Sequence, residues 1–504
     1  MPTLRGILYL ITPTYLVEEM PVLMRKLIPL IIIAFITIPI GVKLAVRSAN
    51  NGSEHRDSPK IITTVDWSAI EGTVTSLGFG VNAFQGFRPN SFNSSIYQHN
   101  MLVMKPGLIR FHNSSALQDA STPDGLIDSA HKSWDVNKVK SALAASFSAF
   151  GQHQPQRMIN IPTWPDWMDA DRDGFLDRDR FDDYARLCAD LVKIVNQDSH
   201  FKTKYWEITN EKDDLYFTQF HSNSGWGGLK DAESPDRLND LIAIYNKAAS
   251  AMKQVDPNIH VGGPGISRAD LQPFYIPFIK GTSNRLDFFT YHFYATGSAS
   301  TPDKEVFDAT SKVGDYTASI VKVLKENSPS RMIPAMLDEY NISWTWETRD
   351  PRMTNHKGVV FDALSTIEAL SNGAVATLAW NEKDGIYGRM DDQCKLRIGG
   401  HFLKLMNQFT IGDYVLTATS NRDIINTFAV RNLGLGHRTY LSINRSNEDR
   451  QIQIKFTGWS PTRPNLTMYM LSSSGYIKKI VNWSDVKDNF TMPANSVILM
   501  TGLE

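Results

Sequence analysis

Short apolar runs recur along the middle of the chain, and each is closed by polar residues or glycine. Runs of this length that are rich in aliphatic and aromatic residues predict buried β-strands. Eight of them fall at residues 77–82, 108–113, 158–164, 205–211, 260–265, 288–294, 335–341 and 376–382.

Helical patterns separate these strands. In the segment 238–252, the side chains of Leu238, Leu241 and Tyr245 fall on one face of a helix, as expected for a helix that packs on a sheet. Because a parallel crossover needs about a dozen residues, eight strand–helix repeats predict an α/β fold of the (β/α)8 barrel type. The alternative is an open, doubly wound sheet, which shows the same alternation. The other helical patterns lie at 181–195, 319–324 and 359–370.

The chain is longer than a barrel requires. It has 504 residues, whereas a (β/α)8 domain typically has about 250. From about residue 411 the helical periodicity fades, and short alternating segments separated by Gly, Pro, Asn and Ser predict an antiparallel β-sandwich. These segments lie at 424–430, 438–443, 451–456, 466–471 and 496–501, and residues 60–66 are expected to add an early strand. The predicted parts are an N-terminal segment (1–47), a linker with the early strand (48–70), a catalytic barrel (71–410) and a sandwich (411–504).

The N-terminal segment contains an apolar run without charges at 27–42, flanked by Arg25, Lys26 and Lys43. The run is shorter than the ~20 residues of a usual membrane span, but Lys43 can snorkel and lengthen it. We therefore expect a transmembrane signal anchor that keeps its N-terminal side in the cytoplasm and the rest of the chain outside it. The alternative is a cleaved secretory signal, because residues 7–17 are also apolar.

Charge and cysteine content exclude two function classes. The net charge is −1 and both signs are mixed along the chain, so no basic field favours nucleic acid as a partner. The two cysteines, Cys188 and Cys394, lack the paired spacing of a zinc site. We expect them to be free or structural, with a disulfide as the alternative for an extracytoplasmic domain.

Two carboxylates stand at the ends of predicted strands. Glu211 follows Asn210 at the end of the fourth strand, and Glu339 lies near the end of the seventh. Because the carboxyl ends of barrel strands meet at one face, Glu211 and Glu339 are expected to converge. Glycoside hydrolysis needs one carboxyl group that donates a proton and one that is ionised. The amide of Asn210 is suited to bind the 2-hydroxyl group of a sugar.

These residues resemble the paired signature of the large clan of retaining (β/α)8 glycosidases. Within this clan the chain is most similar to family 39 glycoside hydrolases, which include β-xylosidases, α-iduronidases and endoglycosidases of bacterial exopolysaccharides and carry a β-sandwich after the barrel. The similarity covers residues 72–406 and the tail. It implies that Glu211 is the acid/base and Glu339 the nucleophile. Many members have Pro after the acid/base, whereas this chain has Lys212.

Further polar residues lie at other strand ends. A guanidinium at Arg110, on the second strand, would bind the nucleophile and keep it ionised. His112 on the same strand, and His292 and Tyr294 on the sixth, are candidates for substrate binding, with the last two favoured by the family resemblance. The alternative for His292 and Tyr294 is a place among the packed aromatic residues of the barrel core.

Tryptophan residues at strand ends suggest sugar-binding platforms, because the C–H faces of sugars stack on indole rings. Trp380 ends the eighth strand and matches the platform that the clan places beneath the sugar. Trp164 ends the third strand; it would form a further subsite or cap the barrel.

An acidic loop follows the third strand and is similar to a calcium-binding loop, with alternating carboxylates and a glycine at the sixth position. Its twelfth position is Arg180 instead of a bidentate Glu. The alternative is an acidic loop that caps the helix beginning near Arg180. The candidate calcium ligands are Asp169, Asp171, Asp173 and Asp177.

Together these patterns predict a membrane-anchored, extracytoplasmic retaining glycosidase that needs no cofactor for catalysis and acts on a polysaccharide. The charge of Glu339, about 5 Å away, is expected to raise the pKa of Glu211 so that it can act as an acid. The alternatives are an exo-acting glycosidase of the β-xylosidase type, a transglycosylase, and a carbohydrate-binding protein without turnover.

Overall fold

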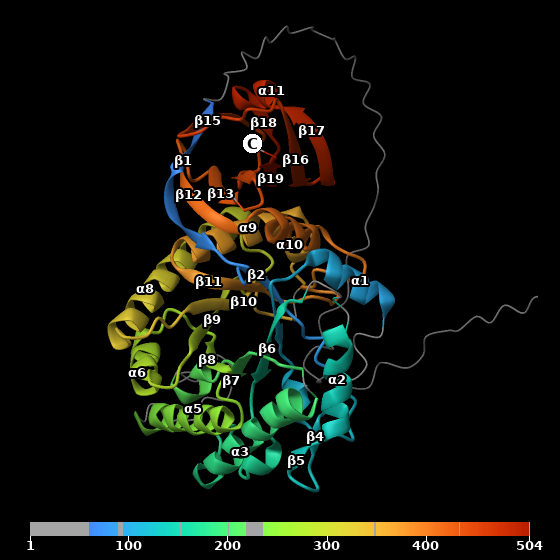
Figure 1. The fold of residues 1–504 in the computed structure, drawn as a ribbon, viewed down its shortest axis with the longest axis vertical. Helices are drawn as coiled ribbons and strands as arrows, with labels where there is room; N and C mark the ends of the chain where they lie inside the picture. Colours follow the sequence, from blue (N-terminus) through green and yellow to red (C-terminus); the bar gives the residue numbers. More distant parts are fainter. Residues whose placement is uncertain are drawn as a thin grey trace, which may run out of the picture. The chain divides into compact units, whose positions relative to one another are not determined.

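The computed structural model describes residues 60–88, 94–148, 150, 154–199, 201–217, 235–346, 349–432 and 434–502. Eight parallel strands close into a barrel in the order β10-β11-β2-β3-β6-β7-β8-β9 (Figure 1). All eight predicted strands are present, and closure of the sheet excludes the open doubly wound alternative. The strands are β2 (Phe79–Asn82), β3 (Leu108–Phe111), β6 (Gln156–Ile161), β7 (Tyr205–Ile208), β8 (His260–Ile266), β9 (Phe288–Thr296), β10 (Ala335–Ser343) and β11 (Ala374–Ala379).

Helices connect the barrel strands and surround them (Figure 1). The four predicted helices correspond to α3, α5, α8 and α9. In α3 the residues Phe181, Tyr184, Cys188 and Leu191 are buried, because their spacing places them on the face that packs inward. The helices are α1 (Ser95–Met104), α2 (Val136–Ser148), α3 (Phe181–Val192), α4 (Asp213–Tyr216), α5 (Pro235–Val255), α6 (Gln272–Thr282), α7 (Asp303–Asp308), α8 (Ser311–Asn327), α9 (His356–Ser371) and α10 (Ile398–Phe409).

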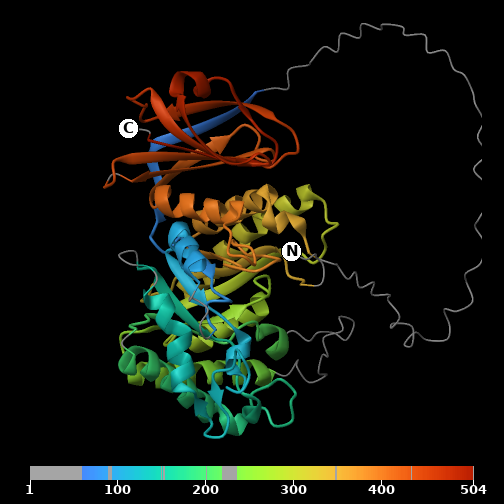
Figure 2. The ribbon, with the colours of Figure 1, turned by 90° about the vertical axis from the view of Figure 1, so that its right-hand side faces the viewer.

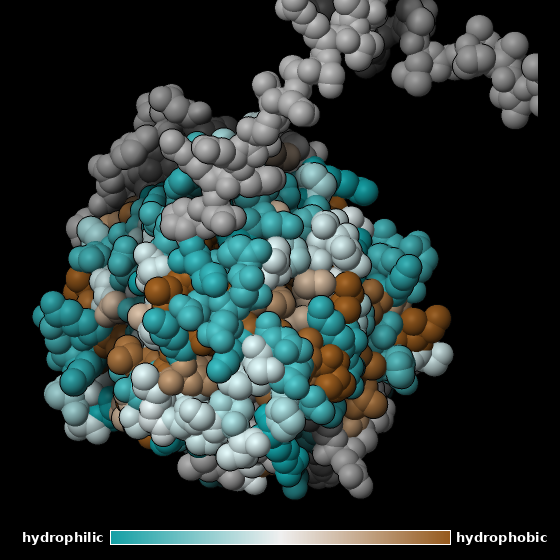
Figure 3. Space-filling view, turned by 90° about the horizontal axis from the view of Figure 1, so that it is seen from above, coloured by the Kyte–Doolittle hydropathy of each residue, from teal (hydrophilic) through white to brown (hydrophobic). Residues whose placement is uncertain are grey.

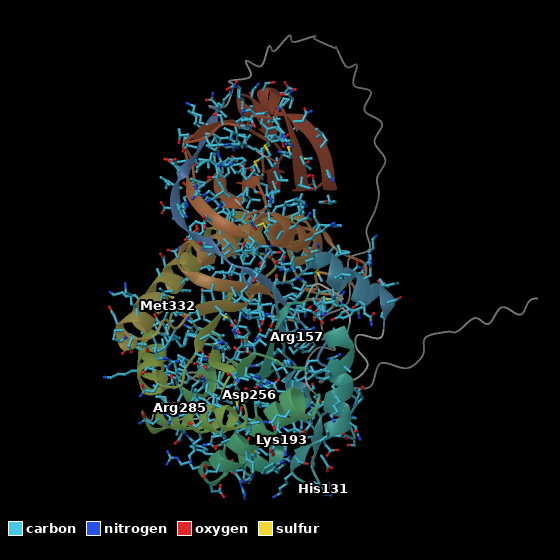
Figure 4. All side chains as sticks on the ribbon, in the orientation of Figure 1. His131, Arg157, Lys193, Asp256, Arg285 and Met332 are labelled. Carbon is cyan, nitrogen blue, oxygen red and sulfur yellow. The ribbon has the colours of Figure 1, made fainter. Side chains whose placement is uncertain are left out.

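Side chains fill the barrel interior in layers. Near the amino-terminal ends of the strands, the buried cluster is apolar and includes Leu108, Met158, Phe288 and Met336. Arg157, Asp256, Arg285 and Met332 lie at the start of β6 or on the connections into β8, β9 and β10, so they mark this end of the barrel (Figure 4). The polar residues described below lie at the opposite, carboxyl-terminal end.

A second sheet of nine strands has the order β17-β16-β19-β14-β13-β12-β1-β15-β18. β1 (Ile61–Val74) pairs antiparallel with β12 and parallel with β15. The predicted early strand is therefore confirmed, but the sheet is mixed and not purely antiparallel, because this strand enters beside β15 in the same direction. The other strands of this sheet, and the helix α11 between two of them, are β12 (Gly412–Thr419), β13 (Ile425–Asn432), β14 (His437–Asn444), β15 (Arg450–Thr457), β16 (Asn465–Ser472), β17 (Gly475–Asn482), α11 (Trp483–Lys487), β18 (Phe490–Met492) and β19 (Ser496–Thr501).

The second sheet buries apolar side chains on both faces. One set packs within the sheet region itself, and the other packs on the barrel helices. Residues 57–504 form one compact unit. Leu441 and Leu499 belong to the same buried cluster as the barrel helices, and the ring of His401 on α10 stacks on Tyr476 at 4.4 Å. The sheet lies beside α9 and α10 in Figure 2. Seen from above, the molecule shows mainly polar residues with small hydrophobic groups between them (Figure 3).

Two further predictions concern cysteines and the membrane. Cys188 and Cys394 are both buried and free, so the expectation of free thiols is confirmed and the disulfide alternative is not. None of the helices in the described ranges is long and apolar enough to cross a membrane. The predicted anchor at 27–42 lies outside the described residues and stays a prediction.

Candidate active site

Glu211 and Glu339 come together at the carboxyl-terminal end of the barrel. One carboxylate oxygen from each and a ring nitrogen of His292 lie within 4.8 Å of one another. Glu211 follows β7 in a left-handed backbone conformation, with φ of 51°, and its N–H donates to the carbonyl of Gly265 at 2.7 Å. This tight turn holds the carboxylate over the barrel mouth. The convergence predicted from strand positions is therefore present in the structure.

A local irregularity in β10 aims two consecutive acidic residues into the barrel. The register between β10 and β9 shifts between Leu337 and Glu339, so Asp338 bulges from the ladder. Such a bulge re-aims side chains that would otherwise alternate between the two faces of a strand. As a result, both Asp338 and Glu339 reach the guanidinium of Arg110.

Arg110 on β3 is fully buried and organises the site. Its Nε contacts Glu207 at 2.6 Å and Asp338 at 3.0 Å, and its Nη1 contacts Glu339 at 3.1 Å. Its Nη2 donates to the amide oxygen of Asn210 at 2.6 Å. This hydrogen bond fixes the orientation of the Asn210 amide, whose NH₂ group can donate to a ligand. The predicted role of Arg110 as a partner of Glu339 fits this geometry.

Glu339 is the more enclosed of the two candidate catalytic carboxylates, with 8% of its side chain exposed. The hydroxyl group of Tyr294 donates to its second oxygen at 2.6 Å. Burial raises the pKa of Glu339 above its usual value, the charge of Glu211 adds to this, and the charges of His292 and Arg110 oppose it. Donors on both oxygens fix the orientation of this carboxylate.

Glu211 is more open, with 38% of its side chain exposed. Its Oε1 lies 2.7 Å from Nδ1 of His292. Burial opposes ionisation of Glu211, but the hydrogen bond and charge of His292 lower its pKa below the usual value. This is the reverse of the sequence-based expectation, which considered only the like charge of Glu339 and not the imidazole.

His292 is itself buried and surrounded by carboxylates. Burial would lower its pKa, but the negative charges around it, that of Glu339 first, raise it above its usual value. His292 and Glu211 therefore hold one proton between them near neutral pH. A protonated Glu211 beside a neutral imidazole differs from the imidazolium–carboxylate pair only in the position of that proton along the 2.7 Å hydrogen bond.

His112 and Trp380 form one wall of the site. The His112 Nδ1 pairs with the amide oxygen of Asn160 at 2.7 Å, which makes Nδ1 the donor, because an amide oxygen accepts only. Burial and the charge of Arg110 lower the pKa of His112 to about 3, so the ring is neutral and its other nitrogen is an acceptor. The ring of Trp380 lies 5.5 Å from that of His112, edge to face.

Trp164 lies beside the site but is almost buried, with 5% exposure. The ammonium group of Lys212 lies over its ring, 4.5 Å from the centroid. Burial lowers the pKa of Lys212 to about 8. The residue that departs from the usual Pro of the clan therefore presents a cation next to Glu211 and covers the indole face that was expected to be a platform.

The acidic loop brings together three of its four candidate calcium ligands. Carboxylate oxygens of Asp169, Asp171 and Asp177 lie within 4.8 Å of one another. Asp173 is not in this group, and one of its oxygens lies 3.7 Å from Arg237. Asp177 precedes the turn that leads into α3, but it makes no side-chain cap, so the helix-capping alternative is not seen.

Several residues of the site were missed from the sequence. Glu207 and Asp338 are carboxylates inside buried parallel strands, where apolar residues are the rule; that exception is the signal that identifies them. Glu382, at the end of the predicted strand 376–382, is a further residue for which the sequence indicates no role. It accepts hydrogen bonds from the backbone N–H groups of Phe84, Gln85 and Gly86 and from Tyr97, and so fixes the loop after β2.

Two sequence comparisons show similarity to glycoside hydrolases. A family model described as glycosyl hydrolases family 39 matches residues 228–381, a segment that includes His292 and Glu339. A β-xylosidase from Caldicellulosiruptor saccharolyticus is 23% identical over 192 residues, which is 38% of this chain and 35% of the relative. The chain thus spans about a third of the length of that relative.

Solved structures share the fold at low identity. A GH39 enzyme from Xanthomonas axonopodis pv. citri is 15% identical, with a TM-score of 0.60 over 90% of this chain and 99% of that one. A monomeric β-xylosidase from Caulobacter crescentus CB15 is 16% identical, with a TM-score of 0.60 over 87% and 99%. A GH51 arabinofuranosidase from Xanthomonas axonopodis pv. citri is 11% identical, with a TM-score of 0.64 over 88% and 99%.

Proposed function

We propose that this chain, which is similar to the glycoside hydrolases of family 39, is a retaining glycosidase that cleaves a polysaccharide. The observation that carries the mechanism is the approach of Glu211 and Glu339, whose nearest oxygens lie within 4.8 Å. Retaining glycosidases hold their two carboxyl groups about 5–5.5 Å apart, whereas inverting enzymes need about 6.5–9.5 Å to admit a water molecule.

In the first step, Glu339 attacks the anomeric carbon and a bond forms between that carbon and its carboxylate oxygen. The glycosidic bond breaks, and Glu211 gives its proton to the departing oxygen. Arg110 and Tyr294 hold the attacking carboxylate in place. The amide NH₂ of Asn210 donates to the 2-hydroxyl group, an interaction that strengthens in the transition state.

In the second step, Glu211 removes a proton from a water molecule, which attacks the anomeric carbon and releases Glu339. The single proton that Glu211 shares with His292 leaves with the departing group in the first step, and the proton taken from water replaces it in the second. Two inversions at the same carbon give net retention of configuration. No cofactor takes part in either step, and a calcium ion at Asp169, Asp171 and Asp177 would stiffen the loop after β6 without touching the substrate.

Aromatic residues support a polymeric substrate and cleavage within the chain. Four aromatic rings follow one another with short distances between their centroids. The distance is 5.4 Å from Trp380 to Phe84, 6.1 Å from Phe84 to Trp346 and 5.5 Å from Trp346 to Tyr387. Trp346 and Trp344 are 52% and 59% exposed. A series of rings from the buried site to the surface suits several consecutive sugar units. An anchor at 27–42 would direct the enzyme to a matrix or cell-surface polysaccharide.

The test is intact mass spectrometry of the full chain after incubation with 2-deoxy-2-fluoroglycosides of several sugars, followed by peptide mapping. We expect one covalent adduct on Glu339 and none in the Glu339→Gln variant. An adduct elsewhere, or a product of inverted configuration in NMR spectra taken early in the digestion, would overturn the retaining assignment.

A second assay separates the alternatives. With a polysaccharide substrate, cleavage within the chain lowers viscosity long before monosaccharide appears, whereas an exo-acting enzyme of the β-xylosidase type releases monosaccharide from the start. Transfer to an added acceptor sugar would indicate a transglycosylase. Saccharide binding without any product, equal in wild type and Glu339→Gln, would indicate a binding protein.

A further inference from the structure

Beneath the nucleophile lies a second pair of acidic residues that the proposed reaction does not use. Glu207 on β7 and Asp338 on β10 are both completely buried. Both contact Nε of Arg110, at 2.6 and 3.0 Å, so the two carboxyl groups share one cationic partner, and each shifts the pKa of the other. Two carboxylates in contact without water repel strongly unless one of them carries a proton.

Among the described residues, Oε1 of Glu207 and Oδ1 of Asp338 receive no hydrogen bond, and Oδ2 of Asp338 has only the ion-pair contact with Nε of Arg110 at 3.0 Å. The other oxygen of Glu207 is well supplied, because Arg110 and the amide of Asn160 donate to it at 2.6 and 2.8 Å. Buried polar atoms without a partner are rare in folded proteins, so each requires an explanation. A proton between the two carboxyl groups supplies the missing donor.

The groups around Asp338 carry charges of both signs. Arg110 from β3 faces it with a positive charge, and Nε2 of His292 from β9, a second source of positive charge, lies 3.6 Å away. Glu207 faces it from β7, Glu339 follows it on β10, and the neutral phenol of Tyr291 lies on the β9 side. With Asp338 ionised, Arg110 would face three carboxylates. With Asp338 neutral, it faces two, one structural and one catalytic.

We propose that Asp338 is a neutral carboxylic acid that donates a hydrogen bond to Glu207, and that the pair carries a single negative charge that positions Arg110 beneath Glu339. Burial and the charge of Glu207 raise the pKa of Asp338 well above its usual value. For Glu207, burial acts in the same direction, but Arg110 and the hydrogen bond from Asp338 lower the pKa. Asp338 is thus a positioning residue, and its link to catalysis rests on the proposed function.

The proton can be detected without any substrate. An infrared difference spectrum of the full chain near neutral pH, wild type minus Asp338→Asn, is expected to contain the C=O band of a carboxylic acid. Glu207→Gln should lose the same band, because Asp338 then ionises against Arg110. A carboxylate band in place of the acid band would overturn the proposal. If either variant fails to fold, the wild-type band must shift when aspartate is labelled with ¹³C at its side-chain carboxyl group.

The pH profile of kcat/KM tests the consequence for the site. Asp338→Asn keeps both the donor and the charge, so the acid limb should stay in place while kcat/KM falls by less than about tenfold. The double variant Asp338→Asn/Glu207→Gln removes the shared charge. Its acid limb should move to lower pH, and kcat/KM should fall by about a hundredfold as Arg110 shifts.

These outcomes distinguish failure of the proposed proton pair from failure of the proposed glycosidase function. If Asp338→Asn alone moves the acid limb to lower pH by a full unit, Asp338 carries a charge in the wild type and the proposal is wrong. If the wild type cleaves no glycoside but shows the acid band, the proton pair stands and the proposed function fails.

Discussion

The barrel interior contains two layers that differ by one step along the same strands. Leu108, Met158 and Met336 belong to the apolar cluster, and two residues further along these strands stand Arg110, Asn160 and Asp338. Because side chains on one face of a strand recur every second residue, about 6.6 Å apart, the lower residue of each pair lies directly under the upper one. The interior side chains therefore change from apolar to charged or polar between one layer and the next.

The difference shows how one scaffold serves stability and reactivity. The apolar layer stabilises the fold through burial alone, and it tolerates exchange of one apolar side chain for another of similar volume. In the polar layer the charges are buried and depend on specific partners, and loss of the shared partner, Arg110, leaves several carboxylates uncompensated. Substitutions in the upper layer should therefore affect activity most, and those in the lower layer should affect only stability.

The largest expected effect is on catalysis at Glu339. Glu339→Gln removes the attacking carboxylate and should lower kcat by about four orders of magnitude or more. The melting temperature should hold or rise, because the repulsion between Glu339 and Glu211 is removed. Parallel kinetics and thermal unfolding check this. A residual activity above one percent would contradict the nucleophile assignment.

Substitution of Arg110 should lower both the activity and the stability of the protein. Arg110→Met leaves buried carboxylates without their partner, and we expect a loss of about 3–5 kcal/mol in the free energy of unfolding together with loss of most activity. A matched control is Arg389→Met, since Arg389 forms a buried ion pair with Asp362 at 2.9 Å outside the site. The control should lose comparable stability and retain kcat. Equal loss of kcat in both variants would show that destabilisation, not position, explains the effect.

Met336 tests the apolar layer. Met336→Ala opens a cavity beneath Asp338, and the free energy of unfolding should fall by about 2–5 kcal/mol. Well below the melting temperature, kcat should remain close to that of the wild type. Denaturant unfolding and kinetics on the same preparation measure both quantities. A large fall in kcat would mean that the two layers are coupled more strongly than their separate chemistry implies.

Sequence reasoning predicted the lower layer better than the upper one. Apolar periodicity identified all eight strands, because burial imposes the same pattern on every parallel strand. It also placed Glu211 and Glu339 at one end of the barrel. It missed Glu207 and Asp338, since their roles depend on partners from other strands, and the bulge that brings Glu339 to the same side of β10 as Asp338 leaves no local pattern. For the same reason it predicted the wrong direction for the pKa of Glu211, which depends on His292.

The pH profile should report the partners of the upper layer. Activity requires an ionised Glu339, whose raised pKa places the acid limb above the ~4.3 of an ordinary Glu. It also requires the proton held by His292 and Glu211, so activity should persist until the pH approaches the raised pKa of His292. In His292→Gln the proton is held by Glu211 alone, and the alkaline limb should move to lower pH. An unchanged alkaline limb would exclude His292 from the proton pair.

The smallest effect is expected at the acidic loop, which lies outside both layers. Calcium that binds only the folded chain stabilises it by about 2.7 kcal/mol at a hundred times its dissociation constant, which should raise the melting temperature by a few degrees. Asp171→Asn should abolish the shift, because Asp171 belongs to the cluster of three. Asp173→Asn is the matched control, since that carboxylate faces Arg237 instead, and it should retain the shift. If both variants lose it, the loop rearranges around the ion to use all four carboxylates; if the wild type shows no shift, the similarity to a calcium loop is one of pattern only.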